Sequence, residues 1–264
     1  LLKQIIESRN IDEKRCPARS LGAIINRWKD RGLEPEQITP TEEIEFADSL
    51  ASNLYRDYQQ RLSKLNAADF GDLLLHNLTI FRHEQEVLKV YQQRFRFILV
   101  DEYQDTNISQ YLWLRLLAQG HTNICCVGDD DQSIYAWRNA DIRNILSFQK
   151  SYPKATLIQL NENYRSTSTI IEAATQLISS NRDRLPNKIW TNNHLGPPII
   201  IHEAFNGEEE AEFVIRRIEH LIREEGVQQA ECAVMYRVNA QSRMIEEACL
   251  KFGMKYRLVG GIRF

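Results

Sequence analysis

Residues 97–105 read FILVDEYQD, and the rest of the chain is best understood outward from them. The apolar run at 97–100 gives way at once to the adjacent carboxylates of Asp101 and Glu102. A short, continuous apolar run bounded by polar residues is typical of a strand buried on both faces of a parallel sheet. Because open α/β sheets bind ligands beyond the carboxyl ends of their strands, we expect the two carboxylates at a ligand-binding edge.

Further short apolar runs follow, separated by segments with helical periodicity. The runs lie at 124–127, 156–158, 199–201, 233–235 and 256–259. The intervening helices are expected at 109–118, 167–181, 208–225 and 240–252. Short apolar runs that alternate with helices predict an α/β fold from residue 95 onward, with helices flanking parallel sheets.

The first 66 residues contain no run typical of a strand, and their acidic and basic residues are balanced. Thr39 to Glu42 form a predicted capping box with Pro40 at the first helical position, and apolar residues then recur at steps of three and four as far as Leu65. A long amphipathic helix is therefore expected here, with a second helical stretch at 69–93. The sequence predicts an all-helical N-terminal subdomain.

Composition and charge exclude several classes of protein. The 264 residues are 43% hydrophobic and 26% charged without a long apolar run, which favours a globular protein over a disordered chain or a membrane protein. The net charge of −3 argues against a uniformly basic nucleic-acid coat but permits a local groove. The five cysteines lack CxxC spacing, so we interpret them as reduced core thiols of a cytoplasmic protein.

One phosphate-binding motif is missing from these residues. No glycine precedes Lys-Ser or Lys-Thr, so the P-loop sequence GxxxxGK[ST] does not occur. The chain also begins with Leu1 and stops soon after a Gly-Gly pair. We therefore expect a fragment of a longer protein.

Polar residues follow each of the first predicted strands. Asp101 is suited to holding Mg²⁺ together with phosphate oxygens, and Glu102 to acting as a general base. The run Asp129 to Asp131 suggests a nearby cation or basic partner, and Gln132 is suited to sensing a phosphate without adding charge. The alternatives are acidic residues that cap the next helix and a solvated turn.

Aromatic and basic residues come next along the chain. Tyr135, Trp137 and Arg138 suit stacking on exposed bases, worth about 1–3 kcal/mol per base, although aromatic side chains also fill cores. After the third run, Tyr164 is suited either to stacking on a nucleobase or to filling a gap between sheet and helix. Arg165 is suited either to reaching a transferring phosphoryl group or to a surface salt bridge.

Taken in order, these segments resemble a known family. DEYQDTN at 101–107, VGDDDQSIYAWRNA at 127–140 and LNENYRS at 160–166 are similar to motifs II, III and IV of superfamily 1 DNA helicases of the UvrD/PcrA/Rep type. Further matches lie at 66–74, 235–243 and 256–261. The resemblance covers essentially the whole chain. It implies an N-terminal all-helical accessory subdomain followed by two RecA-like P-loop NTPase motor domains, both incomplete.

The resemblance also implies a domain organisation. Residues 1–66 would form the accessory 1B-like subdomain, which leans on duplex DNA. Residues 67–160 would be the C-terminal part of the first RecA-like domain, and residues 161–264 the N-terminal part of the second. The basic side chains that would contact the duplex, with a solvated helical face as the alternative, are Arg15, Arg19, Arg27 and Lys29.

ATP and Mg²⁺ are the cofactors that the resemblance implies. Asp101 would hold Mg²⁺, and Glu102 would be the catalytic base. Gln132 would contact the γ-phosphate and couple its state to DNA binding. Tyr164 would stack on adenine, and Arg165 would meet the γ-phosphate from the other side.

Single-stranded DNA and junctions of single- and double-stranded DNA are the implied partners, with repair or replication proteins besides and no membrane. Tyr135, Trp137 and Arg138 would line the single-strand groove. Arg237 and Asn239 would contact the strand from the second motor domain. The activity implied is ATP-dependent 3′ to 5′ translocation and unwinding, in DNA repair or replication.

Two departures from the family pattern matter. Motif III usually reads WRGA, whereas residue 139 is Asn, which tolerates left-handed backbone angles. The P-loop is absent, and the chain ends before motifs V and VI, so we expect the fragment alone to hydrolyse ATP negligibly. Three alternatives stay open: the helicase portion of an AddA-type helicase-nuclease, a non-catalytic DNA-binding module and a carboxylate-based Mg²⁺ nuclease.

Overall fold

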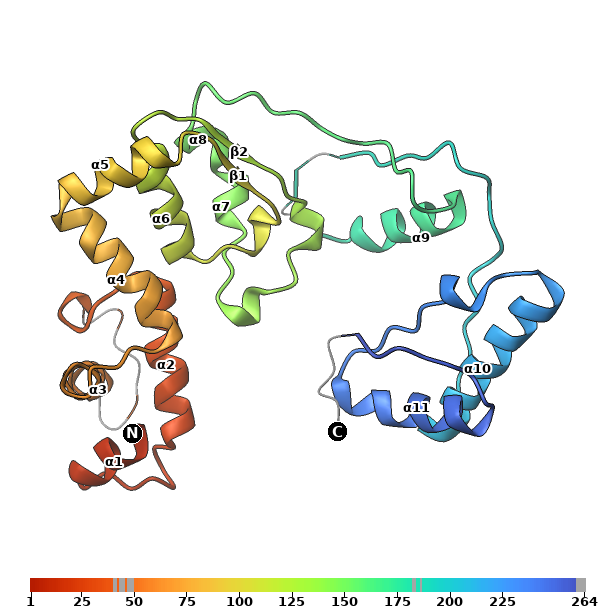
Figure 1. The fold of residues 1–264 in the computed structure, drawn as a ribbon, viewed down its shortest axis with the longest axis horizontal. Helices are drawn as coiled ribbons and strands as arrows, with labels where there is room; N and C mark the ends of the chain where they lie inside the picture. The colour runs from red at the N-terminus through yellow and green to blue at the C-terminus, as the bar shows by residue number, and fades with distance from the viewer. Residues whose placement is uncertain (40–41, 43–45, 47–49, 182–183, 186, 260–264) are drawn as a thin grey trace. The chain divides into compact units, whose positions relative to one another are not determined.

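The computed structural model describes residues 1–39, 42, 46, 50–181, 184–185 and 187–259 (Figure 1). Contacts between Cα atoms divide the chain into one unit of residues 1–194 and another of residues 195–264. Each unit is described by itself. The domain boundaries expected at 66/67 and 160/161 remain a prediction.

The described residues of the N-terminal segment form helices joined by turns, without a strand. Its helices are α1 (Leu2–Ser8), α2 (Ala18–Asp30) and α3 (Ala51–Lys64). They share a buried core in which the rings of Trp28 and Tyr55 stack 5.9 Å apart. Pro40 and Thr41 of the predicted capping box lie outside the described residues, and the helix that the structure describes begins at Ala51.

The single helical stretch predicted at 69–93 is two helices, α4 (Phe70–His83) and α5 (Gln85–Arg94). The backbone leaves the helical region at Glu84, with φ −109° and ψ 80°, and nothing in the sequence explains this break. Asp69 starts α4 through a capping box: its Oδ1 accepts a hydrogen bond from the Asp72 backbone N–H at 2.9 Å, and the Asp72 carboxylate accepts one from the Asp69 N–H.

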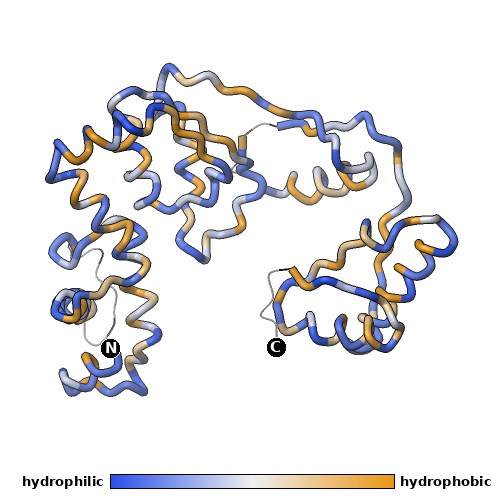
Figure 2. Tube along the Cα trace, in the orientation of Figure 1, coloured by the Kyte–Doolittle hydropathy of each residue, from blue (hydrophilic) through white to orange (hydrophobic). Residues whose placement is uncertain are grey.

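Two parallel strands confirm the α/β prediction for the centre of the chain. Strands β1 (Ile98–Val100) and β2 (Ile124–Cys126) pair in register, Ile98 opposite Ile124, and helix α6 (Ile108–Ala118) connects them. Figure 2 shows hydrophobic residues along both strands. Ile98 packs against the cluster formed by α4, α5 and α6, whereas Leu99 on the opposite face is exposed.

The prediction of four further strands, at 156–158, 199–201, 233–235 and 256–259, is wrong. Among the described residues, only an isolated parallel bridge between Glu162 and Trp190 adds to the β1–β2 pair. A strand requires a hydrogen-bonded neighbour, and an apolar run supplies the side chains for burial but not that neighbour. Ile201 and Met235 in these segments are accordingly 93% and 92% exposed.

In the first unit the later helices are α7 (Arg143–Leu146), α8 (Phe148–Ser151) and α9 (Ser168–Ile178). In the second unit α10 (Gly207–Glu224) packs on α11 (Ser242–Lys251) through a small buried cluster that includes Ile215 and Cys249. Three of these later helices, α9, α10 and α11, agree with prediction to within a few residues, whereas α7 and α8 were not predicted.

All five cysteines are free, as expected for reduced thiols, but the prediction that they lie in the core is wrong for four of them. Cys249 is buried, whereas Cys125 is exposed on β2, because the alternation along a strand turns it away from the helices that cover the sheet. No helix in the described part of the chain is long and apolar enough to cross a membrane.

Candidate functional site

The carboxyl end of β1 presents Asp101 and Glu102, both exposed. The Asp101 Oδ1 accepts a hydrogen bond from the Glu102 backbone N–H at 3.0 Å. Glu102 has φ 51° and ψ 44°, a left-handed conformation that is uncommon for a residue other than glycine. Such backbone strain gathers at functional sites, where the surrounding structure holds it in place.

A buried amide connects the end of β1 to the end of β2. The Gln104 side chain is 1% exposed, and its Nε2 donates a hydrogen bond to Glu102 Oε2 at 2.7 Å. Its Oε1 accepts one from the Asp129 backbone N–H at 3.0 Å, and Gln132 Nε2 donates to Asp129 Oδ2 at 2.7 Å. Glu102 and Gln132, which the sequence singled out separately, are therefore joined by a path of three hydrogen bonds.

The close approach of these two loops requires glycine at position 128. A Cβ on Gly128 would lie 2.6 Å from Gln104 Oε1 and 3.2 Å from the Tyr103 backbone nitrogen. The Tyr103 N–H also donates to the Val127 carbonyl at 3.0 Å. A side chain at position 128 would push the two strand ends apart and break the path between them.

Two of the three carboxylates after β2 face a segment far along the chain. The Arg184 guanidinium forms two hydrogen bonds with the Asp131 carboxylate, and the Leu185 backbone N–H donates to Asp130 Oδ2 at 2.7 Å. The hydrogen bond with Asp131 raises the pKa of Arg184. Arg184 is thus a basic partner for Asp131, one of the two explanations that the sequence offered for the acidic run. Over the described ranges no cluster of three His, Cys, Asp or Glu side chains is placed to hold a metal ion.

Asp101 by itself fits the Mg²⁺ role expected of it. The carboxylate is exposed at the strand end, beside Glu102. Mg²⁺ usually keeps several waters and takes one or two carboxylates together with phosphate oxygens, so a single exposed carboxylate suffices in the presence of a nucleotide.

The predicted stacking residues form one small exposed turn. A 3₁₀ helix at Ala136–Arg138 leaves the Trp137 ring 65% exposed and 6.3 Å from the Tyr135 ring. The Arg138 guanidinium lies 4.6 Å from the Trp137 ring centre and 5.2 Å from that of Tyr135. Asn139 ends the turn at φ 63°, the left-handed conformation expected from its sequence.

Tyr164 and Arg165 lie on the loop before α9. The Tyr164 ring is 79% exposed, and its hydroxyl donates a 2.6 Å hydrogen bond to Glu162, which raises the pKa of Tyr164. Asn163 Oδ1 accepts hydrogen bonds from the backbone N–H groups of Arg165 and Ser166, which fixes the loop. Within the described residues no hydrogen bond or ion pair connects these side chains with the path from β1 to β2.

Arg237 and Asn239 belong to the second unit, and both are exposed. The Gln241 side-chain oxygen accepts hydrogen bonds from the backbone N–H groups of Arg237 and Val238, at 3.1 and 3.0 Å. Arg237 thus lies just before a 3₁₀ helix at Asn239–Gln241, which Asn239 begins, and the role of both residues in strand binding stays a prediction.

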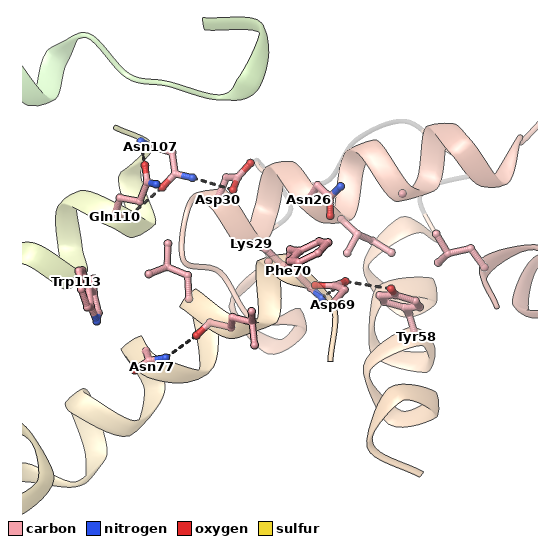
Figure 3. A pocket seen from close by; sticks show the side chains of 16 residues that line it. Asn26, Lys29, Asp30, Tyr58, Asp69, Phe70, Asn77, Asn107, Gln110 and Trp113 are labelled. Atoms are coloured by element: carbon pink, nitrogen blue, oxygen red, sulfur yellow. Dashed lines mark hydrogen bonds and ion pairs between the residues drawn. The ribbon is translucent and has the colours of Figure 1, made fainter. Parts of the chain in front are cut away.

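Three of the four basic residues predicted to contact duplex DNA, Arg15, Arg19 and Arg27, are exposed. The prediction is wrong for Lys29, whose side chain has no exposed surface. The Lys29 Nζ lies 2.7 Å from Asp69 Oδ2 and 2.6 Å from Asp72 Oδ1, so its charge is paired inside the protein (Figure 3 shows Lys29 beside Asp69). Burial raises the pKa of Asp69, but hydrogen bonds and the Lys29 charge outweigh it and leave that pKa below its usual value.

Reasoning from sequence missed Gln104 and, although it singled out the run Asp129 to Asp131, it did not predict the link that Asp129 makes. Gln104 and Asp129 join the two strand ends, and their signal was a polar side chain directly after each acidic strand end.

Comparisons with known proteins extend over the whole chain. Residues 1–153 match the model of the UvrD/REP helicase N-terminal domain, and residues 158–264 match that of the UvrD-like helicase C-terminal domain. The chain is 43% identical over 265 residues to a DNA helicase II of Rickettsia typhi and 42% identical over 264 residues to a probable DNA helicase II homolog of Rickettsia felis. It is 44% identical over 269 residues to the ATP-dependent DNA helicase PcrA of Staphylococcus aureus. All of the chain is covered in each case, but only 40%, 40% and 36% of these relatives, respectively.

Proposed function

Because the chain belongs to the UvrD-like helicase family, we propose that it is part of an ATP-dependent DNA helicase that moves 3′ to 5′ along single-stranded DNA and unwinds duplex in repair or replication. The observation that carries this proposal is the path of hydrogen bonds from Glu102 through Gln104 and Asp129 to Gln132.

This path supports a division of labour at the nucleotide. Glu102 is the proposed general base, and the N–H of Gln104 holds one oxygen of its carboxylate at 2.7 Å. Gln104 thereby holds the Glu102 carboxylate in one orientation, as a general base that takes a proton from water requires. Gln132, at the other end of the path, is the proposed contact to the γ-phosphate. A change at the phosphate then reaches the base through fixed hydrogen bonds.

The remaining nucleotide contacts are assigned by chemistry. Asp101 would hold Mg²⁺, which when bound neutralises charge on the phosphates of ATP. Tyr164 offers an exposed ring for the adenine, and Arg165 offers a guanidinium for the γ-phosphate. We propose that the 264 residues alone turn over ATP negligibly, because their sequence contains no GxxxxGK[ST] to cradle the phosphates.

Single-stranded DNA is the proposed second ligand. The turn with Tyr135, Trp137 and Arg138 combines exposed aromatic surface with a positive charge, the pairing that stacks on bases and meets backbone phosphates. Arg237 and Asn239 would add strand contacts from the second unit. Because Trp137 follows Gln132 by five residues, movement at the phosphate contact has a short route to the strand contact.

Binding of a fluorescein-labelled oligo(dT) by the 264-residue chain, followed by anisotropy at low and moderate salt, tests the strand contact. Trp137→Ala should weaken binding about fivefold or more, since a stacked base is worth about 1–3 kcal/mol. Phe205→Ala removes an aromatic ring that is likewise exposed (93%) but has no assigned role, and should leave the affinity unchanged. Equal binding by wild type and Trp137→Ala would refute the assignment of this turn.

A further inference from the structure

The carboxylate of Asp30, the last residue of α2, joins two segments that lie far apart in the sequence. Its Oδ1 accepts a hydrogen bond from Asn107 Nδ2, and its Oδ2 accepts one from Asn139 Nδ2, both at 2.8 Å. Asn107 is the N-cap of α6, and Asn139 ends the turn that carries Trp137. Figure 3 shows Asp30 and Asn107 at a pocket of about 760 Å³ lined by residues of α2, α4 and α6.

The end of α2 is held by contacts of Lys29 to α4 and α6, so the position of Asp30 is well defined. The neighbouring Lys29 is buried and paired with Asp69 and Asp72 around the start of α4. The Lys29 carbonyl accepts a hydrogen bond from the Ser109 hydroxyl of α6. Burial raises the pKa of Asp30, and the hydrogen bond from Asn139 opposes this shift. A half-buried carboxylate is thus retained where two amides satisfy it.

The side chain of Asn139 reaches across to α2, while its backbone closes the turn. The Asn139 N–H donates to the Ala136 carbonyl at 3.0 Å, and the residue is left-handed at φ 63°. Glycine adopts this conformation without strain, so the backbone alone has no need of an asparagine. What asparagine adds is the amide that donates to Asp30.

We propose that Asp30 is a positioning residue that holds the turn of Tyr135 to Arg138 in its DNA-binding orientation, through Asn139, and ties that turn to the start of α6 through Asn107. The inference rests on the proposed strand contact of Trp137. Asp30 acts through these two amides and does not touch the strand. The Asp30 carboxylate is therefore expected to strengthen DNA binding through the turn, although its negative charge by itself would repel the DNA phosphates.

Two measurements on the 264-residue chain test this. Asp30→Ala, Asn139→Gly and the double variant are compared with wild type, and Glu172→Gln, which removes an exposed negative charge on α9, serves as the control. Hydrogen exchange of the amides at 136–140 reports the tether without DNA. Anisotropy with oligo(dT) reports binding.

Both single variants should accelerate exchange at 136–140 and weaken oligo(dT) binding about tenfold or more, because both remove the hydrogen bond from Asn139 to the charged Asp30 carboxylate, and such a bond is worth about 1.5–3 kcal/mol. The double variant should be no weaker than the single variants, because all three lack the same tether. Glu172→Gln should bind as tightly as wild type or slightly more tightly.

Unchanged exchange in Asn139→Gly overturns the proposal whatever the binding shows. Stronger oligo(dT) binding by Asp30→Ala also overturns it, since the carboxylate would then act by repulsion alone. Faster exchange in a chain whose wild type fails to bind oligo(dT) overturns both the proposed strand contact and the positioning role, but leaves the tether itself established.

Discussion

Replacing Lys29 by methionine tests whether Lys29 stabilises the helical segment as a buried ion-pair partner of Asp69 and Asp72 and does not contact DNA. Methionine keeps the length and apolar stem of lysine but removes the charge, and it leaves Asp72, itself 1% exposed at the side chain, without its cation. Breaking a buried pair by removing one partner costs about 3–5 kcal/mol, because an uncompensated charge stays inside. Tyr58 and Gln59 still donate hydrogen bonds to the two carboxylates, at 3.0 and 2.8 Å, which places the expected loss near 3 kcal/mol.

Urea unfolding followed by far-ultraviolet circular dichroism measures this loss at neutral pH. Arg27→Met removes an exposed positive charge from the same helix and should change the free energy of unfolding by less than about 0.5 kcal/mol. If Lys29→Met unfolded like wild type but bound DNA more weakly, Lys29 would be a DNA contact after all and the burial argument would fail.

The same pair gives a pH dependence with a definite sign. The pKa of Asp69 is lowered in the folded state, so its ionised form stabilises the fold above the unfolded value of about 3.9. That contribution is lost as pH falls through the lower folded pKa. The difference in unfolding free energy between wild type and Lys29→Met should therefore shrink below about pH 4. A difference that stays constant down to pH 3 would contradict the ion pair.

Two further predictions concern the strand ends. Gly128→Ala should destabilise the chain by about 1–3 kcal/mol in urea unfolding, because the new Cβ would lie 2.6 Å from Gln104 Oε1. Gly207→Ala is the control and should be close to neutral, because the nearest atom to its Cβ would be 3.7 Å away; equal effects of the two substitutions would refute the packing argument. Gln104→Ala should lower the free energy of unfolding by about 2–4 kcal/mol, since it removes a buried side chain with two hydrogen bonds, one of them to a carboxylate. A loss below about 0.5 kcal/mol would mean that Gln104 does not hold the path from Glu102 to Gln132.

The sequence predicted helices better than strands, and the physics explains why. Helix α6 begins at the residue after a local cap, because Asn107 and Gln110 satisfy each other's backbone groups within one turn. Strands β1 and β2 were found because each has the other as neighbour. The runs at 199–201 and 233–235 look equally strand-like, but no local signal reports whether a pairing partner lies beside them.

The candidate site shows the same division between local and distant information. Glu102 and Gln132 stood out because their residue types and positions after a strand carry chemistry. Gln104 was missed because its role depends on Asp129, which is distant in sequence and meets it only in the fold. Lys29 was misassigned because an exposed and a buried lysine look alike on paper, and its partners Asp69 and Asp72 lie about 40 residues away.

Steady-state, DNA-stimulated ATP hydrolysis by the whole protein that carries these residues, compared between wild type and Glu102→Gln, tests the central claim most directly. Glutamine preserves the shape of the side chain but cannot accept the proton from water, so kcat should fall about 10²- to 10⁴-fold while oligo(dT) binding stays within about twofold. A kcat within a few-fold of wild type would contradict the assignment of the end of β1 as the catalytic edge.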